Sequence, residues 1–250
     1  DGSDSNNTAT ITVDTVLPTI ALTSSTANLK AGETATITFT LSETSSDFIE
    51  GDITFSGGTL SSFNAVSGTS YTVVFTPSTN STSNGVISVA NTKFTDAAGN
   101  ANADGSDSNN TATITVDTVL PTFVQAFQYD TDGDGNIDEI VVELSEAVSD
   151  VSVTYGDFAL GSSGTVDGFS SFSSGSRANT KDAADNDEFI TLEVSVTGTA
   201  DVTVGYTNNS TGNDLVDLAG NDAATNTSIT TDDQAAPVII AAQTKDINGN

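Results

Sequence analysis

The sequence contains no cysteine, histidine, tryptophan or methionine, and only five of its 250 residues are Lys or Arg. Without cysteine, neither disulfides nor thiolate metal sites can form. Without histidine or cysteine, Ser–His, Cys–His and metal–His catalytic sites are excluded. Carboxylate pairs of the kind that glycosidases use are available, but the acids lie in turns and there is no tryptophan to stack on a sugar. The composition therefore predicts a protein that is not an enzyme.

The shortage of basic residues leaves 34 acidic residues and a formal net charge of −29. Nucleic acids and anionic membrane surfaces require a basic footprint, so neither is expected as a partner. Repulsion among this many carboxylates opposes a compact fold unless cations neutralise part of the charge. Calcium suits this task because it prefers carboxylate oxygens. We therefore expect an extracellular protein in which bound Ca²⁺ takes the place of disulfides.

Long apolar runs and a signal peptide are also missing. No stretch approaches the length of a transmembrane span, so membrane insertion is not expected. The first residue is Asp1 rather than an initiating methionine, and no leader pattern follows it. We expect the chain to be a segment of a longer protein.

Three landmarks indicate that the chain repeats itself. The stretch "DGSDSNNTATITVDTVLPT" occurs at 1–19 and again, letter for letter, at 104–122. Two shorter landmarks, "LSE" and "D-x-AGN", also occur twice, at 41–43 and 144–146 and at 96–100 and 217–221. Internal repeats of this length indicate tandem domains rather than a short solenoid repeat. The predicted parts are the last strand of a preceding repeat at 1–13, a first domain at 14–117, a second domain at 118–233 with an insertion within 161–188, and the start of a third repeat at 234–250.

The strand pattern sets the fold class. In "TATITFTL", residues 34–41, threonines alternate with Ala35, Ile37, Phe39 and Leu41, which predicts a half-buried strand. No helical periodicity of useful length appears. Further strands are expected at 19–24, 53–56, 70–76, 85–90, 111–116, 140–144, 151–155, 189–196, 201–206 and 225–230. About seven short strands per repeat predict an all-β protein of tandem immunoglobulin-like β-sandwich domains.

The combination "VDTVLPT…LKAGETATITFTLSE…DAAGN" resembles the bacterial immunoglobulin-like repeats of very large cell-surface adhesins. The shared features are the linker, the Thr-rich strand and the D-x-AGN loop. The resemblance covers the whole first domain, whereas the second departs from it in its first turn and in 161–188. It implies extracellular extender modules, many of which are stiffened by Ca²⁺ at their junctions.

Acidic and amide side chains are expected to gather at one end of each domain. If the strands alternate in direction, the linker, the end of the Thr-rich strand and the D-x-AGN loop meet there. These residues are Asp14, Glu43, Asp96 and Asn100 in the first domain and Asp117, Glu146, Asp217 and Asn221 in the second. Such oxygens are Ca²⁺ ligands. The same Asp-x-x-Gly-Asn pattern is also ordinary turn chemistry, so a metal-free turn remains the alternative.

The stretch "DTDGDGNIDE", residues 130–139, predicts a more specific calcium site. It places acids at the first, third, fifth and ninth loop positions and glycine at the sixth. The helix-flanked version of this loop ends in Glu at the twelfth position, but Val141 stands there and both flanks read as strands. We therefore expect a calcium loop in a β-turn rather than a calcium sensor. The predicted ligands are Asp130, Asp132, Asp134, Asn136 and Asp138, completed by Glu139, Glu143 or a water, with Asp233 expected nearby.

These patterns predict a calcium-stiffened extender segment of a repetitive extracellular adhesin or filament, which projects a distal binding region. Two alternatives remain. The second domain could bind a cell-surface or glycan ligand through 161–188. The strands at 1–13 and 237–250 could instead complement neighbouring copies in a filament. The expected partners are thus neighbouring repeats of the same chain, copies of itself, or such a ligand.

Overall fold

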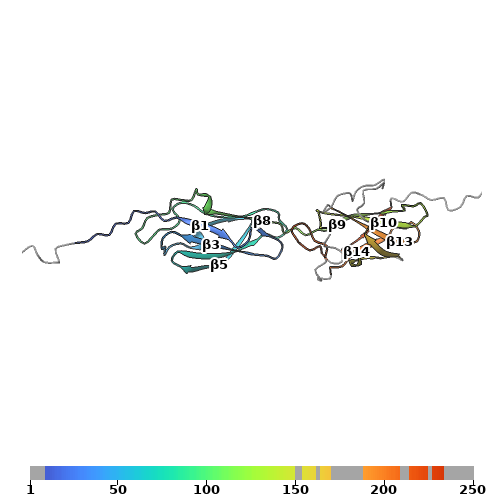
Figure 1. The fold of residues 1–250 in the computed structure, drawn as a ribbon, viewed down its shortest axis with the longest axis horizontal. Coiled ribbons are helices and arrows are strands. Elements are labelled where there is room, and N and C mark those ends of the chain that lie inside the picture. The colour runs from blue at the N-terminus through green and yellow to red at the C-terminus, as the bar shows by residue number, and fades with distance from the viewer. Residues whose placement is uncertain are drawn as a thin grey trace, which may run out of the picture. The chain divides into compact units, whose positions relative to one another are not determined.

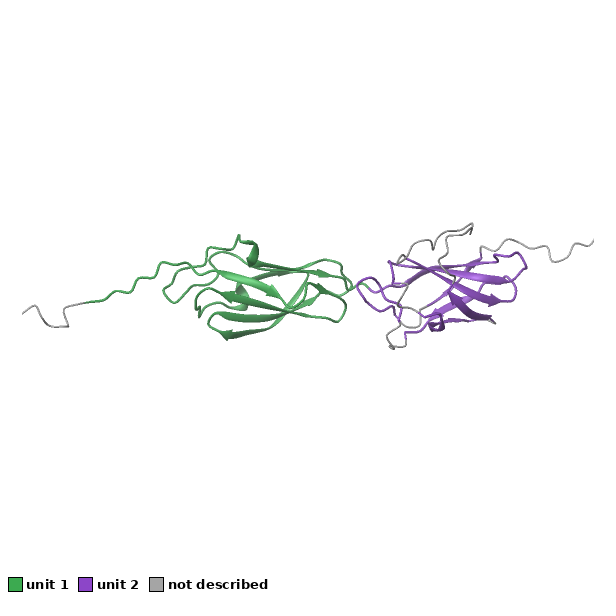
Figure 2. Ribbon diagram, in the orientation of Figure 1, with its two compact units in different colours: residues 1–119 green, residues 120–250 purple. Residues whose placement is uncertain are grey.

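The computed structural model describes residues 9–149, 154–161, 164–169, 188–208, 214–224 and 227–233. The chain forms two compact units, Asp1–Val119 and Leu120–Asn250 (Figure 2). They divide in the linker, two residues after the expected boundary. The expected third repeat and most of the expected insertion lie outside the described residues.

Unit 1 consists of two sheets that share one core (Figure 1). The first has the order β1-β3-β6-β5 and comprises β1 (Ile20–Ser24), β3 (Ala35–Leu41), β6 (Ser70–Pro77) and β5 (Gly58–Ser67). The second has the order β2-β8-β7-β4 and comprises β2 (Asn28–Leu29), β8 (Thr111–Val116), β7 (Gly85–Val89) and β4 (Ile53–Ser56). All neighbours are antiparallel except β2 and β8, which are parallel. The predicted immunoglobulin-like sandwich is confirmed.

The core of unit 1 follows from the alternation along β3. Ile37 and Phe39 are fully buried, and they pack with Ile87 of β7 and Ile114 of β8 in one cluster. The threonines between the apolar residues lie on the outer face. Burying each such apolar side chain contributes about 1.5–3 kcal/mol, so these alternating residues hold the two sheets together.

An aromatic cluster holds the two loops that matter most for the candidate site. The ring centroid of Phe48, in the loop after β3, lies 5.5 Å from that of Phe39 and 5.6 Å from that of Phe94, in the loop after β7. The Phe48–Phe94 pair is edge-to-face, a geometry that adds about 0.5–1.5 kcal/mol beyond burial. Because Glu43 precedes Phe48 and Asp96 follows Phe94, the same packing brings both acids to one end of the unit.

Unit 2 is also a two-sheet sandwich, but its strands are divided differently between the two sheets. One sheet has the order β12-β13-β10-β9-β16 and comprises β12 (Gly164–Phe169), β13 (Phe189–Val196), β10 (Ile137–Leu144), β9 (Phe123–Tyr129) and β16 (Asp232–Asp233). The other comprises β11 (Phe158–Leu160), β14 (Thr203–Tyr206) and β15 (Thr227–Thr230). Tyr206, Leu192 and Ile140 are among its fully buried core residues. Within the part of the chain that is described, the only helices are 3-10 turns of three residues, none of which could cross a membrane.

One strand prediction needs correction. Of the strand expected at 151–155, residues 151–153 lie outside the described residues and Tyr155 begins a 3-10 turn, Tyr155–Asp157. The Thr154 hydroxyl donates a hydrogen bond to Asp157 at 2.6 Å, so local side-chain bonding competes with the strand. Strand β12 lies inside the stretch that was expected to be an insertion.

Candidate metal centres

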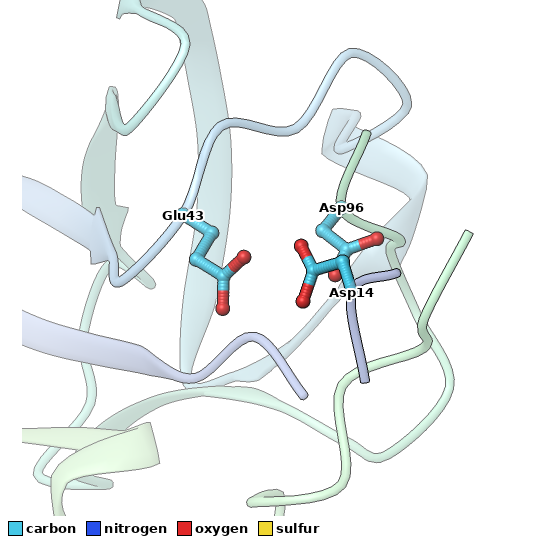
Figure 3. Close-up of side chains that lie close together, drawn as sticks. All are labelled: Asp14, Glu43 and Asp96. Carbon is cyan, nitrogen blue, oxygen red and sulfur yellow. The ribbon is translucent and has the colours of Figure 1, made fainter. Parts of the chain in front are cut away.

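Three acids from distant parts of unit 1 meet at one end of its sandwich. Asp14 lies in the segment that leads into β1, Glu43 follows β3, and Asp96 lies in the loop after β7. One carboxylate oxygen of each lies within 4.8 Å of the other two. Figure 3 shows the three side chains directed toward a common point. This spacing is compatible with a shared cation, and all three residues belong to the predicted set.

The loop that carries Asp96 is held by its own side chain. One Asp96 carboxylate oxygen accepts hydrogen bonds from the backbone N–H groups of Ala98 and Asn100, both at 2.8 Å. The other accepts from the Asn100 amide, also at 2.8 Å. Gly99 closes the turn with a φ of +91°, a conformation that glycine adopts without strain. The turn chemistry and the acidic cluster therefore coexist, so the turn does not argue against a metal.

Asn100 connects this loop to the incoming chain. Its side-chain N–H also donates to the backbone carbonyl of Asp14 at 3.2 Å. The hydrogen bond from the Asn100 side chain outweighs the effect of burial and lowers the pKa of Asp96. Asp96 therefore stays charged, and Asn100 fixes the linker beside it.

Glu43 carries its carboxylate close to two other acids. Desolvation, followed by the nearby carboxylates of Asp14 and Asp96, raises the pKa of Glu43 above its usual 4.5. Both burial and neighbouring like charges disfavour the ionised form of a carboxyl group. A bound divalent cation would reverse this interaction.

The loop beside Asp96 has a further anchor that the sequence did not reveal. The Asp47 carboxylate accepts hydrogen bonds from the Thr95 N–H at 2.9 Å, from the Thr95 hydroxyl at 2.7 Å and from the Ser45 hydroxyl at 2.7 Å. Burial acts to raise the pKa of Asp47, but these bonds outweigh it and the pKa is lowered. Asp47 thus ties the loop after β3 to the loop after β7. No motif distinguishes it from any other exposed loop Asp.

Unit 2 contains an equivalent loop. Asp217 accepts hydrogen bonds from the backbone N–H groups of Ala219 and Asn221 and from the Asn221 amide, each at 2.8 Å. Gly220 has a φ of +88°, which matches Gly99. Glu146 follows β10 as Glu43 follows β3, and its carboxylate lies within 4.8 Å of that of Asp217. Two of the three acidic positions of unit 1 are therefore reproduced within unit 2.

The third position has its counterpart in the second copy of the linker. Asp117 follows β8, and its carboxylate accepts a hydrogen bond from the Val119 N–H at 3.1 Å. Asp14, in the first copy, accepts from the Val16 N–H at the same distance. The two identical linker sequences thus form the same local turn.

The loop at 130–138 folds around its own carboxylates. Asp130 accepts the backbone N–H groups of Gly133 and Gly135 at 2.7 and 2.9 Å. Asp138 accepts both the N–H and the hydroxyl of Thr131 at 2.9 Å. One carboxylate oxygen each of Asp130, Asp132 and Asp138 lies within 4.8 Å of the other two. Thr131 was not predicted, because the loop motif leaves its position open.

Five other predicted residues lie outside this group. Asn136 accepts the Gly198 N–H at 3.0 Å, Asp134 accepts the Asn136 N–H at 2.8 Å, and Glu143 accepts from Gln125 on β9. Glu139 is buried on β10, directly opposite Tyr129 and Glu193 in the sheet register. Asp233 pairs in register with Gln128, two residues before the loop begins. The structure thus gathers three of the predicted loop ligands into one group.

Comparison with known proteins identifies the class of the first unit. Residues 14–113 match the family model of the bacterial Ig-like domain, so unit 1 is a bacterial Ig-like domain. A comparison with curated proteins finds no match. Matching solved structures include the Escherichia coli adhesin FdeC, at 12% identity and a TM-score of 0.43, and the Yersinia pseudotuberculosis adhesin InvE, at 16% identity and a TM-score of 0.30. Each match covers 86% of this chain, but the chain spans only 63% and 58% of those two chains.

Proposed function

We propose that this protein is a calcium-stiffened extender segment of an extracellular, cell-surface adhesin or filament. The observation that carries the proposal is the group of Asp14, Glu43 and Asp96 at one end of unit 1. It joins the segment that leads into the domain to two loops of the domain itself. A cation held there would fix the direction of the incoming chain.

The chemistry of the group favours Ca²⁺. Calcium takes six to eight oxygen ligands at about 2.3–2.6 Å in flexible geometry. Three carboxylates supply part of that set, and backbone carbonyls and waters supply the remainder. Desolvation, followed by Asp14 and Asp96, raises the pKa of Glu43, and a cation shared by the three carboxylates would offset this unfavourable charge.

The repeat extends the proposal to the second linker. Asp117 occupies the place of Asp14 in the repeated sequence, and Glu146 and Asp217 occupy the places of Glu43 and Asp96. We infer a second calcium ion held by these three residues with Asn221. The loop at 130–138 is proposed as a separate site that stabilises unit 2. In this role the partners are neighbouring repeats of the same chain, and a distal region binds the cell-surface or glycan ligand.

The substitution Glu43→Gln should have opposite effects with and without calcium. In chelator the pKa of Glu43 is higher in the folded state than its usual value of 4.5. As the pH rises above 4.5 and through the folded-state pKa, ionisation of Glu43 therefore lowers the free energy of unfolding. Removing the charge should therefore raise the melting temperature of unit 1 in chelator at neutral pH. In calcium the variant lacks a ligand, so the calcium-induced gain should shrink. Calorimetric melting in both conditions measures this.

A matched control for Glu43→Gln is Asp107→Asn. Asp107 is exposed and makes no side-chain cap, and its substitution removes the same single charge. It should leave the calcium-induced gain unchanged. A loss of stability by Glu43→Gln in both calcium and chelator would contradict a metal site and indicate a purely structural role.

The substitution Asp132→Asn should remove one calcium ion from unit 2. Asn retains the oxygen that accepts the Asp134 N–H at 3.0 Å, so the turn is preserved while a charged ligand is lost. Calorimetric titration should give one bound calcium fewer than the wild type, with the unit 1 transition unchanged because the two units have separate cores. An unchanged stoichiometry would reject the assignment of this loop.

A further inference from the structure

Residues 53–92 contain no charged side chain, although the chain holds 34 acidic and 5 basic residues. This stretch forms β4, β5, β6 and β7. The other strands of unit 1 are also uncharged, so the acids of this unit lie in its loops and turns. The strands of unit 1 therefore form a neutral body within a chain whose net charge is −29.

Two free sheet edges lie on one side of this neutral body. β4 is the last strand of the order β2-β8-β7-β4, and β5 is the last strand of the order β1-β3-β6-β5. Only Gly57 separates the end of β4 from the start of β5, and the two strands are in contact. Among the strands that the structure describes, each of them pairs with a single neighbour. The unpaired N–H and C=O groups of such an edge are a template for another strand.

Strand β5 is protected against such pairing by its own irregularity. Its register with β6 shifts between Ser61 and Asn64, and Ser62 has a φ of +55°. A bulge of this kind bends and twists an edge strand, which is a common defence against edge-to-edge pairing. The regular edge on this side of unit 1 is therefore that of β4.

Strand β4 has neither a bulge nor a charge. It pairs with β7 in unbroken register over Ile53–Ser56. A Cβ on Gly57 would lie 2.3 Å from the backbone oxygen of Asn84, so the chain after β4 packs tightly against the residue that precedes β7. Phe55 is 44% exposed, although its register partner Ile87 is fully buried. β4 is thus a firmly held, regular edge that carries a partly exposed aromatic side chain.

Unit 2 protects the equivalent side with a charge. Its edge strands there are β11 and β12, and β12 carries Asp167. Hydrogen bonds from the hydroxyls of Ser195 and Thr165, at 2.6 and 2.7 Å, lower the pKa of Asp167, so this carboxylate stays ionised. A charge on an edge strand opposes pairing with a second copy. Residues 53–67, which form the corresponding side of unit 1, lack any such charge.

We propose that the free edge of β4 is a lateral docking surface for β4 of a second copy of this chain. The two strands pair antiparallel about a two-fold axis, the symmetry of most dimers. Charge favours this partner, because two copies of a chain with a net charge of −29 repel each other wherever their acids meet and can approach at a neutral side. A cationic partner would bind the acidic loops instead. The proposal goes beyond the proposed role of calcium and does not depend on it.

Antiparallel pairing also keeps the nearest acids apart. Asp52 immediately precedes β4. In a two-fold pair centred between Thr54 and Phe55, Asp52 of each copy lies opposite Gly57 of the other. The two Asp52 residues are then five residues apart along the paired strands, about 17 Å at about 3.4 Å per residue. This separation exceeds the Debye length of about 8 Å at physiological ionic strength, so their repulsion is largely screened.

The size of the edge sets the strength of the joint. A pair of four-residue strands buries much less than the roughly 1,600 Å² of a standard interface. A single joint is therefore weak, and association is expected at high protein concentration. Raising the salt concentration should strengthen it, because salt screens the repulsion between the two acidic copies.

Sedimentation equilibrium of the full chain in excess calcium, up to about 1 mM protein, tests the proposal. The wild type should dimerise reversibly, and more strongly as salt rises. Thr54→Asp places like charges on the paired edge and should weaken dimerisation about tenfold. Thr113→Asp is the matched control, since Thr113 is exposed on β8, two strands away from β4 in the same sheet. It makes the same chemical change and should leave dimerisation unaltered.

A cysteine variant locates the contact, because the chain has no cysteine of its own. In mild oxidant, Thr54→Cys should form a disulfide-linked dimer several-fold faster than Thr113→Cys. The melting transition of unit 1 should persist in every variant, since both positions are exposed.

Three results would overturn the proposal. The first is a wild type that stays monomeric up to about 1 mM at every salt concentration. The second is a dimer that Thr54→Asp and Thr113→Asp weaken equally or not at all, which would use another surface. The third is association that falls as salt rises, which would indicate contacts between charges rather than a neutral edge. Since calcium is held constant, these outcomes are independent of whether the calcium sites exist.

Discussion

Removal of calcium should lower the melting temperature of unit 1 by about 10–20 °C. A ligand that binds only the folded state stabilises it by about 2.7 kcal/mol at a hundredfold excess over Kd. In a domain of this size, each kcal/mol corresponds to about 4–8 °C. Unit 2 carries acids for two proposed sites, one at 130–138 and one at Glu146 and Asp217, so its shift should be larger than that of unit 1.

Calorimetry in excess calcium and in chelator, at equal ionic strength, measures the effect. Magnesium serves as the control cation, because it demands near-octahedral geometry and gives up its waters reluctantly. It should restore only the part of the shift that comes from general screening of the −29 charge. Identical melting curves in calcium and chelator would remove the basis of the proposed function.

The meeting of Asp14, Glu43 and Asp96 at one end of unit 1 could be predicted from the sequence, because strand alternation, turn chemistry and the internal repeat all place acids at that end. Alternation along 34–41 fixed which face of β3 is buried, and hence where Glu43 emerges. The Asp-x-x-Gly-Asn pattern predicted a turn at Asp96, and the repeated linker located Asp14. Predicting these three positions required only the direction of each strand and not the full strand order. The crossovers between the two sheets, which were not predicted, therefore did not affect this prediction.

Other features lacked a sequence signal. Strand β5 lies at a sheet edge, and its residues "GTLSSFNAVS" are mostly exposed and follow no strict alternation, so they read as a loop. Asp47 holds two loops together through tertiary hydrogen bonds, which no local pattern encodes. Glu139 was one of three predicted ways to complete the calcium loop, beside Glu143 and a water. It is buried on β10 and lies outside the group of Asp130, Asp132 and Asp138.

Calcium should also narrow the range of orientations that the two units adopt. Short linkers limit domain motion without abolishing it, because interfaces between domains are usually small. Pro121 restricts Leu120 to extended conformations, which removes part of the freedom of the linker. If Asp117 shares a cation with Glu146 and Asp217, as proposed from the repeat, the remaining freedom is lost when calcium binds.

The absence of cysteine makes this motion directly measurable. Thr40 in unit 1 and Thr197 in unit 2 are exposed, so Thr40→Cys and Thr197→Cys provide one spin-label site in each unit. The distribution of distances between the labels should be broad in chelator and several-fold narrower in calcium. Small-angle scattering of the unlabelled protein should show the same change as a longer and better defined maximum dimension.

The substitution Glu146→Gln should keep that distribution broad in calcium while both units stay folded. It removes the charge of one proposed ligand and retains the size of the side chain. Asp217 is a less suitable target, because its carboxylate also closes its own loop through three hydrogen bonds of 2.8 Å. Glu188→Gln is the matched control, since Glu188 is an exposed acid of the same unit outside the acidic groups. If the wild type is equally narrow in calcium and chelator, packing rather than metal sets the geometry of the linker, and Glu146 and Asp217 are ordinary loop residues.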